Sequence, residues 1–329
     1  MGLRGSSAYH GPGWQPRQGT LVDDVRAGAH WRSYAVDADW APLRAVALHS
    51  PSAERLDQAP PDVLQHLDRV DAAALEMEID VLAAVYRGLG IEVHMIPPLR
   101  VSSLGRSLAG ANAMYARDLF WMTPGGAVLS RMASVVRAGE EAQAFALLAS
   151  IGVPVVRSVS GTGTFEGADA LSLRPDLVAI GYGRRTNPQG LAQAAAIAEE
   201  QGRHVITVAV PDGVQHLLGV VQVLDEDLLA VRTELVRPED VAALRNEGFD
   251  LLSVAESEEV RERLGFNFVV VGPRTVVMIA GSPGLEQLLT QHGVEVAASI
   301  AVPQLLRGAG GIACATAVLS RDRVGGEFR

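Results

Sequence analysis

A unit of two short strands, an amphipathic helix and a further strand recurs along the chain, and this repeat limits the possible folds more than any other feature. Short apolar runs predict the strands, and apolar positions at helical spacing predict the helices. Four units are complete, each in the order strand, strand, helix, strand: residues 114–123, 127–132, 139–151 and 153–158; 170–174, 177–182, 189–201 and 204–210; 217–224, 228–233, 238–246 and 249–254; and 268–271, 275–279, 283–292 and 294–298.

The opening unit lacks one strand. Residues 43–49 and 91–96 are predicted strands, with a long helical stretch over residues 62–89 between them. Residues 312–320, at the other end of the chain, can supply the missing strand and close a ring. Repeats about 50 residues apart predict a closed array whose inner loops converge on one central site.

The repeat also sets the expected domain organisation. Residues 1–40 are rich in Gly, Arg, Ser and Pro and show no sustained period, so we expect a flexible N-terminal arm there. Residues 41–329 are expected to form a single α/β domain, because the units of a closed array cannot bury their apolar faces separately.

The only cysteine of the chain, Cys314, follows three closely spaced glycines that begin at Gly308. Glycines let a backbone turn and approach a ligand closely. A predicted strand follows, so we expect the thiol at a loop-to-strand junction. Taken alone, an unpaired cysteine is more often a small buried apolar residue than a nucleophile.

Composition narrows the classes of function. The formal net charge of −10 argues against a nucleic-acid partner and suits a cationic ligand. All 28 basic residues are arginine, so no Schiff-base lysine and no Gly-Lys-Ser/Thr phosphate loop exist. A lone cysteine excludes an intramolecular disulfide and fits a reducing, cytoplasmic location. We expect no cofactor, no metal and no membrane segment, and the sequence leaves open whether the chain forms a homo-oligomer.

Reactive side chains stand at similar places in successive units, each close to the start of a strand. In chain order they are Asp118, Glu166, His216 and Cys314. Singly, they have ordinary explanations: a surface ion pair, a turn or cap residue, a core histidine or a core cysteine. Together they provide a nucleophile, an acid-base group and orienting carboxylates, which recur as a set in active sites.

The segments around these residues resemble the pentein superfamily of guanidine-modifying enzymes, which includes arginine deiminase, dimethylarginine dimethylaminohydrolase and the amidinotransferases. The similarity covers about residues 41–321 and implies a closed five-bladed α/β propeller of ββαβ modules with pseudo-fivefold symmetry. The motifs occur in the family's order: Asn112-x-x-x-x-Arg117-Asp118, Phe165-Glu-Gly-Ala-Asp169, Gly183-x-Arg-Thr-Asn187 and the glycine-led Cys314.

The resemblance implies a mechanism. Asp118 and Glu166 would hold a planar, cationic guanidinium through paired hydrogen bonds. Cys314, as a thiolate, would attack the central carbon, because the thiolate is the competent form and a bound cation lowers its pKa. His216 would protonate the departing nitrogen and then activate water. Cys314, His216 and Glu166 are therefore the predicted catalytic residues.

Further residues match family positions that contact the substrate. Arg131, at the end of its hairpin's second strand, and Arg185 would bind a substrate carboxylate, which a guanidinium fork suits. Asn112 would make a neutral contact, and Asp169 completes the predicted substrate-binding set. The expected partner is thus a small, arginine-like guanidino compound.

The family contains hydrolases and transferases, and the sequence favours a hydrolase. Deiminases and amidinotransferases usually carry His-x-Asp, whereas Leu217 and Leu218 follow His216. Glu166 in place of aspartate also resembles the dimethylarginine hydrolases. We therefore expect a cysteine-dependent hydrolase of arginine or an Nω-substituted arginine that gives a citrulline-type product plus ammonia or an alkylamine.

Two alternatives stay open. The segment that starts at Asp39-Trp40 resembles the opening of amidinotransferases, so transfer of the amidino group to an amine is the second hypothesis. A non-catalytic protein that binds cationic amino acids is the third, because a fold does not fix a function.

Overall fold

The computed structural model describes residues 5–98 and 108–325, and within them the strands form five three-stranded sheets. In each sheet the middle strand pairs antiparallel with one neighbour and parallel with the other. This pattern is the one expected when a hairpin is followed by a helical crossover to a parallel strand. The predicted repeat of strand, strand, helix and strand is confirmed.

The strands and helices of the four complete units lie close to the positions predicted from the sequence. They are β3 (Phe120–Thr123), β4 (Gly126–Leu129), α5 (Glu141–Ser150) and β5 (Val155–Ser158); β6 (Ala170–Arg174), β7 (Leu177–Tyr182), α6 (Pro188–Glu200) and β8 (His204–Ala209); β9 (Val221–Val223), β10 (Leu228–Val231), α7 (Pro238–Asn246) and β11 (Asp250–Ser253); and β12 (Val269–Gly272), β13 (Thr275–Ile279), α9 (Pro283–Gln291) and β14 (Glu295–Ile300).

The first unit is completed from the far end of the chain, as predicted. β1 (Leu43–Leu48) pairs in parallel with β2 (Glu92–Met95), and α4 (Ala72–Gly88) connects these two strands. On its other side β1 pairs antiparallel with β15 (Ala317–Arg321), which follows all the other strands in sequence. The first and last parts of the chain therefore share one sheet.

Four predicted elements have clearly different bounds, and one of them, the predicted strand 217–224, begins with the 3-10 turn η6 (Leu217–Gly219). The stretch 62–89 is divided into α3 (Pro61–Leu64) and α4, because Gln65 is left-handed with φ 64° and Asp71 caps α4. The stretch 114–123 begins with the 3-10 turn η3 (Ala116–Asp118), and residues 312–320 begin with α11 (Ile312–Ala315). Short helical turns thus stand where the sequence indicated the starts of strands.

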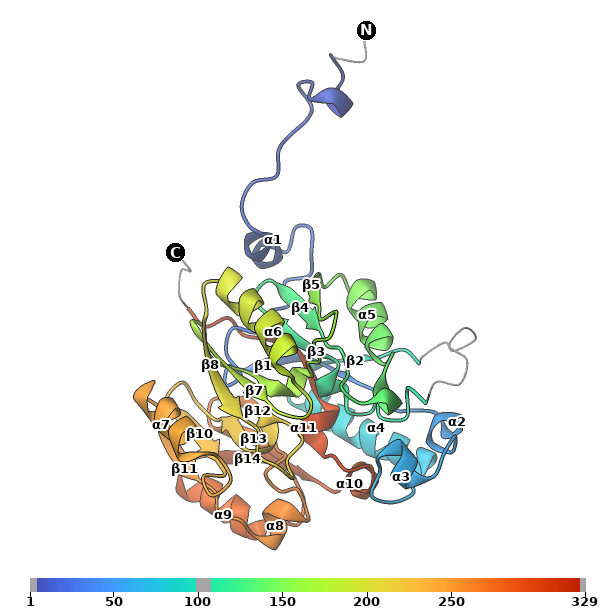
Figure 1. The fold of residues 1–329 in the computed structure, drawn as a ribbon, viewed down its shortest axis with the longest axis vertical. Coiled ribbons are helices and arrows are strands. Elements are labelled where there is room, and N and C mark those ends of the chain that lie inside the picture. The colour runs from blue at the N-terminus through green and yellow to red at the C-terminus, as the bar shows by residue number, and fades with distance from the viewer. Residues whose placement is uncertain (1–4, 99–107, 326–329) are drawn as a thin grey trace.

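The helices of the five units lie at the outside of the body, around the strands (Figure 1). Proline at the first helical position begins α6, α7 and α9, where its missing N–H costs nothing. The middle strands are apolar and almost wholly buried, as expected for strands covered on both faces. None of the helices within 5–98 and 108–325 is long and apolar enough to cross a bilayer.

The N-terminal segment divides into two parts. The residues that carry η2 (Ser7–Tyr9) extend away from the body in Figure 1, with α1 (Leu21–Ala27) nearer to it. Residues 34–40, which the sequence assigned to the flexible arm, are buried. Asp39 in particular donates its backbone N–H to the carbonyl of Ser172 at 2.7 Å and accepts the N–H of Ser172 at Oδ2 at 2.8 Å.

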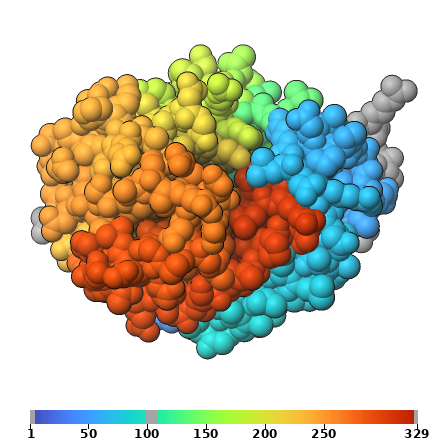
Figure 2. Space-filling model, turned by 90° about the horizontal axis from the view of Figure 1, so that it is seen from below, coloured from blue at the N-terminus to red at the C-terminus, as the bar shows by residue number. Residues whose placement is uncertain are grey.

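The remaining short helices are α2 (Ala53–Leu56), α8 (Glu258–Arg261) and α10 (Pro303–Arg307). Seen from below, the red C-terminal segment reaches the surface between the blue N-terminal residues and the orange residues of the later units (Figure 2). The backbone N–H groups of Leu67 and Asp68 both donate to the carbonyl of Arg307, which ties these distant segments together.

Candidate active site

Equivalent turns of successive units bring the candidate side chains to one place. Asp118 ends η3, Glu166 is the residue before η5 (Gly167–Asp169), and His216 is the residue before η6 (Leu217–Gly219). Each turn leads directly into the first strand of its unit. The repeated sequence positions therefore become neighbouring positions in space.

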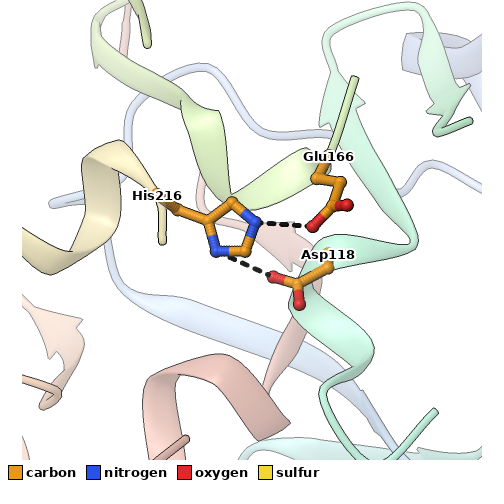
Figure 3. A group of neighbouring side chains, drawn as sticks. All are labelled: Asp118, Glu166 and His216. Carbon is orange, nitrogen blue, oxygen red and sulfur yellow. Dashed lines mark hydrogen bonds and ion pairs between the residues drawn. The ribbon is translucent and has the colours of Figure 1, made fainter. Parts of the chain in front are cut away.

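His216 lies between the two carboxylates (Figure 3). Its Nε2 is 2.7 Å from Oε2 of Glu166, and its Nδ1 is 3.6 Å from Oδ1 of Asp118. All three side chains are at most 5% exposed. The predicted grouping of Asp118, Glu166 and His216 is thus present in the structure.

Close packing fixes Glu166 in this group. Gly167 follows it, and a Cβ at this glycine would come within 2.2 Å of the carbonyl oxygen of Phe120. No other residue fits there, so the Glu-Gly pair of the motif has a steric cause. Oε1 of Glu166 also accepts the backbone N–H of Ala133 at 3.0 Å.

A buried arginine that sequence reasoning missed joins the cluster. Arg137 Nη1 is 2.5 Å from Oδ2 of Asp118 and 3.9 Å from Oε2 of Glu166. Its Nε donates to Oε2 of Glu140 at 2.8 Å, and Glu140 in turn accepts the backbone N–H groups of Gly110 and Asn112. The spacing Arg137-x-x-Glu140 was the available signal for this ion pair.

Burial and charge shift the pKa values of the group. Burial alone would lower the pKa of His216, but the charge of Asp118 and the hydrogen bond to Glu166 raise it to about 9. Burial opposes ionisation of Glu166 as well, yet the hydrogen bond and charge of His216 hold the pKa of Glu166 below its usual range. At neutral pH His216 is therefore an imidazolium that can donate a proton.

Cys314 and His216 line the same cavity, which has a volume of about 370 Å³. Apolar side chains, among them Leu218, Leu264 and Phe266, form part of its wall. Burial raises the pKa of the Cys314 thiol to about 11, and the charge of Asp118 acts in the same direction. Without a ligand the thiol is therefore protonated at neutral pH.

The Cys314 thiol also has a partner that the sequence did not indicate. Asn267, two residues before β12, donates from Nδ2 to Sγ at 3.0 Å. The predicted loop-to-strand junction is more exactly the short helix α11, which places Cys314 one turn before β15.

The predicted carboxylate-binding arginines occupy different surroundings. Arg185 is half-buried, with Nη1 3.6 Å from Oε1 of Glu166 and Nη2 donating to Gln215, a residue of the cavity wall. Arg131 follows β4, is exposed, and donates to the carbonyl of Gly163 at 3.0 Å. Arg185 thus borders the site, whereas Arg131 lies outside the cavity lining.

The side chain of Asn112, predicted to contact a substrate, forms hydrogen bonds within the protein. Its Nδ2 donates to the carbonyl of Leu64 at 2.8 Å, and its Oδ1 is 3.2 Å from Nε2 of His66. Both ends of the amide are therefore occupied by the segment after α3, and the residue is 4% exposed. Asn112 fixes that segment beside the site.

Asp169 likewise has internal partners for both oxygens. Thr186 donates to Oδ2 at 2.6 Å, and the N–H of Leu217 donates to Oδ1 at 2.9 Å. Both carboxylate oxygens are therefore used within the protein, and the predicted contact of Asp169 with a substrate stays a prediction. Asp169 holds the residue that follows His216 and so positions the imidazole.

A metal ion fits the group poorly, although one ligand atom each of Asp118, Glu166 and His216 lies within 4.8 Å of the others. The guanidinium of Arg137 already neutralises Asp118 and adds positive charge next to Glu166. The raised pKa of His216 favours its protonated form, which has no free lone pair for a metal. The chemistry that this set suits is proton transfer.

The buried carboxylate of Asp169 should make the free energy of unfolding depend on pH. Burial raises its pKa to about 6, above the ordinary value of about 3.9 in an unfolded chain. The folded protein therefore binds the proton more tightly than the unfolded chain, and protonation of Asp169 stabilises the fold. This stabilisation is complete below pH about 4 and is lost as the pH rises through 6. We expect Asp169→Asn to remove this part of the pH dependence, about 2 kcal/mol between pH 4 and 7.

Urea unfolding of both proteins at several pH values measures this difference. Asp176→Asn, at the exposed hairpin turn of the same unit, is the matched control. Parallel curves of unfolding free energy against pH for wild type and Asp169→Asn would contradict the assignment.

Comparison with known proteins by sequence finds similarity to arginine deiminases. The family described as arginine deiminase matches residues 109–248. An uncharacterised Bacillus subtilis protein, YkgA, is 25% identical over 208 residues, 63% of this chain and 70% of that protein. Arginine deiminase of Mycobacterium tuberculosis is 29% identical over 197 residues, 50% of this chain and 48% of the enzyme. The chain thus spans about half the length of the curated arginine deiminases that it matches.

The fold of this chain is similar to solved structures over most of its length. A dimethylarginine dimethylaminohydrolase of Pseudomonas aeruginosa superposes with a TM-score of 0.64 and 20% identity, covering 84% of this chain and 99% of that one. The inosamine-phosphate amidinotransferase StrB1 of Streptomyces griseus gives 0.69 and 18%, covering 88% and 97%. The chain therefore shares its fold with guanidine-modifying enzymes of the pentein superfamily and, over residues 109–248, is similar in sequence to arginine deiminases, in line with the resemblance of the ordered motifs. Its relatives with named activities are hydrolases and amidinotransferases.

Proposed function

We propose that the protein is a cysteine-dependent hydrolase of the guanidino group of arginine or an Nω-substituted arginine. The observation that carries the proposal is an imidazolium held between two buried carboxylates, on the wall of a cavity that it shares with the chain's one cysteine. The family match to arginine deiminase and the fold shared with a dimethylarginine hydrolase support the same class of substrate.

Binding of the cationic substrate starts the chemistry. Its positive charge favours ionisation of the Cys314 thiol, whose pKa burial and the charge of Asp118 otherwise keep high. Asp118 and Glu166 accept hydrogen bonds from the guanidinium and fix its plane. Because Arg137 now holds one oxygen of Asp118, the substrate has to share that carboxylate with it.

Two steps follow. The Cys314 thiolate forms a C–S bond to the central carbon, the C–N bond to the leaving nitrogen breaks, and His216 gives that nitrogen its proton, which releases ammonia or an alkylamine. The cationic amidino-thioether remains on the enzyme. His216 then takes one proton from water as it attacks. The C–S bond breaks, the second proton of that water passes to the departing sulfur, and a neutral ureido product of the citrulline type leaves with the Cys314 thiol and the His216 imidazolium restored.

Transfer to an amine is the second candidate function. The amidinotransferases SxtG and StrB1 superpose with TM-scores of 0.71 and 0.69 and cover 90% and 88% of this chain, against 0.64 and 84% for the dimethylarginine hydrolase. The two reactions share the first step and differ only in whether water or an amine attacks the amidino-thioether.

We also propose that the five sheets close into a propeller that forms one domain over residues 41–329. The pairing of β15 with β1 supports closure, because it joins the last unit to the first. A single domain agrees with the repeat, since a ring that needs both chain ends for one sheet is completed only when the whole chain has folded.

A product assay separates the candidate functions. The purified protein is incubated with arginine, methylated arginines and related guanidines, with and without glycine as the acceptor, and products are identified by mass spectrometry. We expect a citrulline-type product with ammonia or an alkylamine in the absence of glycine. Product that forms only with glycine and carries the amidino group means a transferase. No product under either condition contradicts both reactions.

A further inference from the structure

Asn267 bridges the fifth unit to the turn that carries Cys314. Its Nδ2 donates to the sulfur at 3.0 Å. Its Oδ1 accepts the backbone N–H of Ala313 at 2.8 Å and that of Cys314 at 3.3 Å. One planar amide therefore contacts both the reacting atom and the backbone that aims it.

The surroundings of Asn267 hold this amide in place. Its neighbours Phe266 and Phe268 are buried and contact each other edge to face, with ring centroids 5.5 Å apart. Its own N–H donates to the carbonyl of Leu264 at 2.8 Å. The two buried rings and this turn hydrogen bond hold the backbone of Asn267 where its side chain lines the cavity with Cys314.

The cysteine turn is shaped to receive the amide. A Cβ on Gly311 would come within 2.6 Å of Oδ1 of Asn267 and within 2.7 Å of a side-chain carbon of Ile279. Glycine at position 311 therefore lets the backbone approach Asn267 closely enough for the hydrogen bonds at positions 313 and 314. Of the three glycines before Cys314, Gly311 thus makes room for the asparagine, whereas a Cβ at Gly308 or Gly310 would meet the ring of Tyr115.

We propose that Asn267 positions Cys314 for attack and stabilises its thiolate through the Nδ2–H donor. The proposal rests on the proposed cysteine mechanism and adds to it a residue from the fifth unit, which otherwise contributes nothing to the chemistry. An N–H donor to an anion is stronger than one to a neutral group, so the contact favours the ionised sulfur.

Other charged and titratable groups near the sulfur come from several elements. Asp118 opposes ionisation of the thiol, whereas Arg137 favours it. The phenol of Tyr115 is buried beside the thiol, and the imidazolium of His216 lies on the same cavity wall. Asn267 is an uncharged donor among them, so replacing its amide by a carboxylate changes the charge and keeps the shape.

The wall of that cavity also carries one buried ion pair. Arg232 and Glu256 are joined by two hydrogen bonds of 2.7 Å, so their charges largely cancel at the sulfur. This pair stays the same in all the variants below.

Alkylation by iodoacetamide tests the proposal, because Cys314 is the only cysteine in the chain and intact mass then reports on it alone. Rates are measured from pH 6 to 11 for wild type and for Asn267→Asp, which keeps the backbone acceptor and replaces the donor by a negative charge. We expect the rate for Asn267→Asp at pH 8.5 to fall about tenfold, because the whole rise of the rate with pH moves upward by about one pH unit.

Two further variants make the result decisive. Asn267→Ala removes the donor without adding charge and should lower the rate by a smaller factor, about threefold. Asn246→Asp, at the exposed end of α7, adds the same charge away from the site and should match wild type. Thermal unfolding establishes that each variant is folded, and if Asn267→Asp does not fold, Asn267→Ala decides.

A folded Asn267→Asp or Asn267→Ala protein with the wild-type rate at every pH overturns the proposal. The assay contains no guanidine, so its outcome is separate from that of the proposed function. A protein without any turnover can still show the shift, and an active hydrolase can fail to show it.

Discussion

Cys314→Ala is expected to abolish turnover, lowering kcat by at least roughly 10⁴-fold, because no other residue can form the covalent intermediate. The chain contains no second cysteine and no lysine that could take over. Wild type quenched with acid during turnover should carry the added mass of the amidino group, and the variant should not. Product formation by liquid chromatography and intact-protein mass spectrometry measure both effects.

Binding provides the control for this variant. Cys314 is half-buried and its replacement by alanine removes only one atom, so the fold should be retained. Asp118, Glu166 and His216 are unchanged, and Cys314→Ala should still bind arginine or its analogues in calorimetry. Continued turnover at the wild-type rate would show that Cys314 is not the nucleophile and would remove the basis of both candidate reactions.

Much of the fold follows from one property of the sequence, its repeat. Each unit has a hairpin, a helix and a parallel strand, and the apolar pattern gives these elements directly. The missing strand of the first unit could be assigned to the C-terminus because every unit needs three strands. The starts of the first strands were harder to predict. At Asp118 and Cys314 a helical turn precedes the strand, and hydrophobic periodicity does not distinguish a short buried turn from a strand.

The reactive residues of the site were predictable for the same reason. Asp118, Glu166 and His216 precede equivalent strands, so a ring of units brings them together. Arg137 and Asn267 were not predictable in this way, because Arg137 pairs with Asp118 inside its own unit and Asn267 contacts Cys314 from a different unit, and neither precedes an equivalent strand as the predicted residues do. Their sequence surroundings resemble those of an ordinary turn arginine and a strand-end asparagine, and only the folded arrangement reveals the partner.

For Asn112 and Asp169 the structure shows contacts that the motifs did not indicate. Their positions in the motifs predicted contacts with a substrate, but the polar side-chain atoms of both residues form hydrogen bonds within the protein. A motif defines the position of a residue within a unit. The direction of its side chain depends on the hydrogen-bond partners that neighbouring segments provide. The end of α3 and the residues just after it bind the amide of Asn112. Thr186 and the backbone N–H of Leu217 donate hydrogen bonds to the carboxylate of Asp169.

Glu166→Gln is expected to lower kcat by about 10²-fold or more and to change its pH dependence. The charge of Glu166 and its hydrogen bond help to raise the pKa of His216 to about 9. Once a bound cation has ionised Cys314, the proton required for the first step is the one on His216, so kcat should fall as pH rises through about 9. With glutamine at position 166 the pKa of His216 is lower, and this alkaline decline should begin at a lower pH by about one unit or more.

Measurement of kcat and KM from pH 6 to 10 separates the two roles of Glu166. Glu199→Gln, on the exposed face of α6, removes the same charge away from the site and should leave the profile unchanged. If Glu166 served only to bind the guanidinium, its replacement would raise KM and leave the alkaline decline of kcat where it is. A decline that moves with the charge at position 166 requires that Glu166 acts through the proton on His216, since a carboxylate that only binds the substrate has no means of changing that pKa.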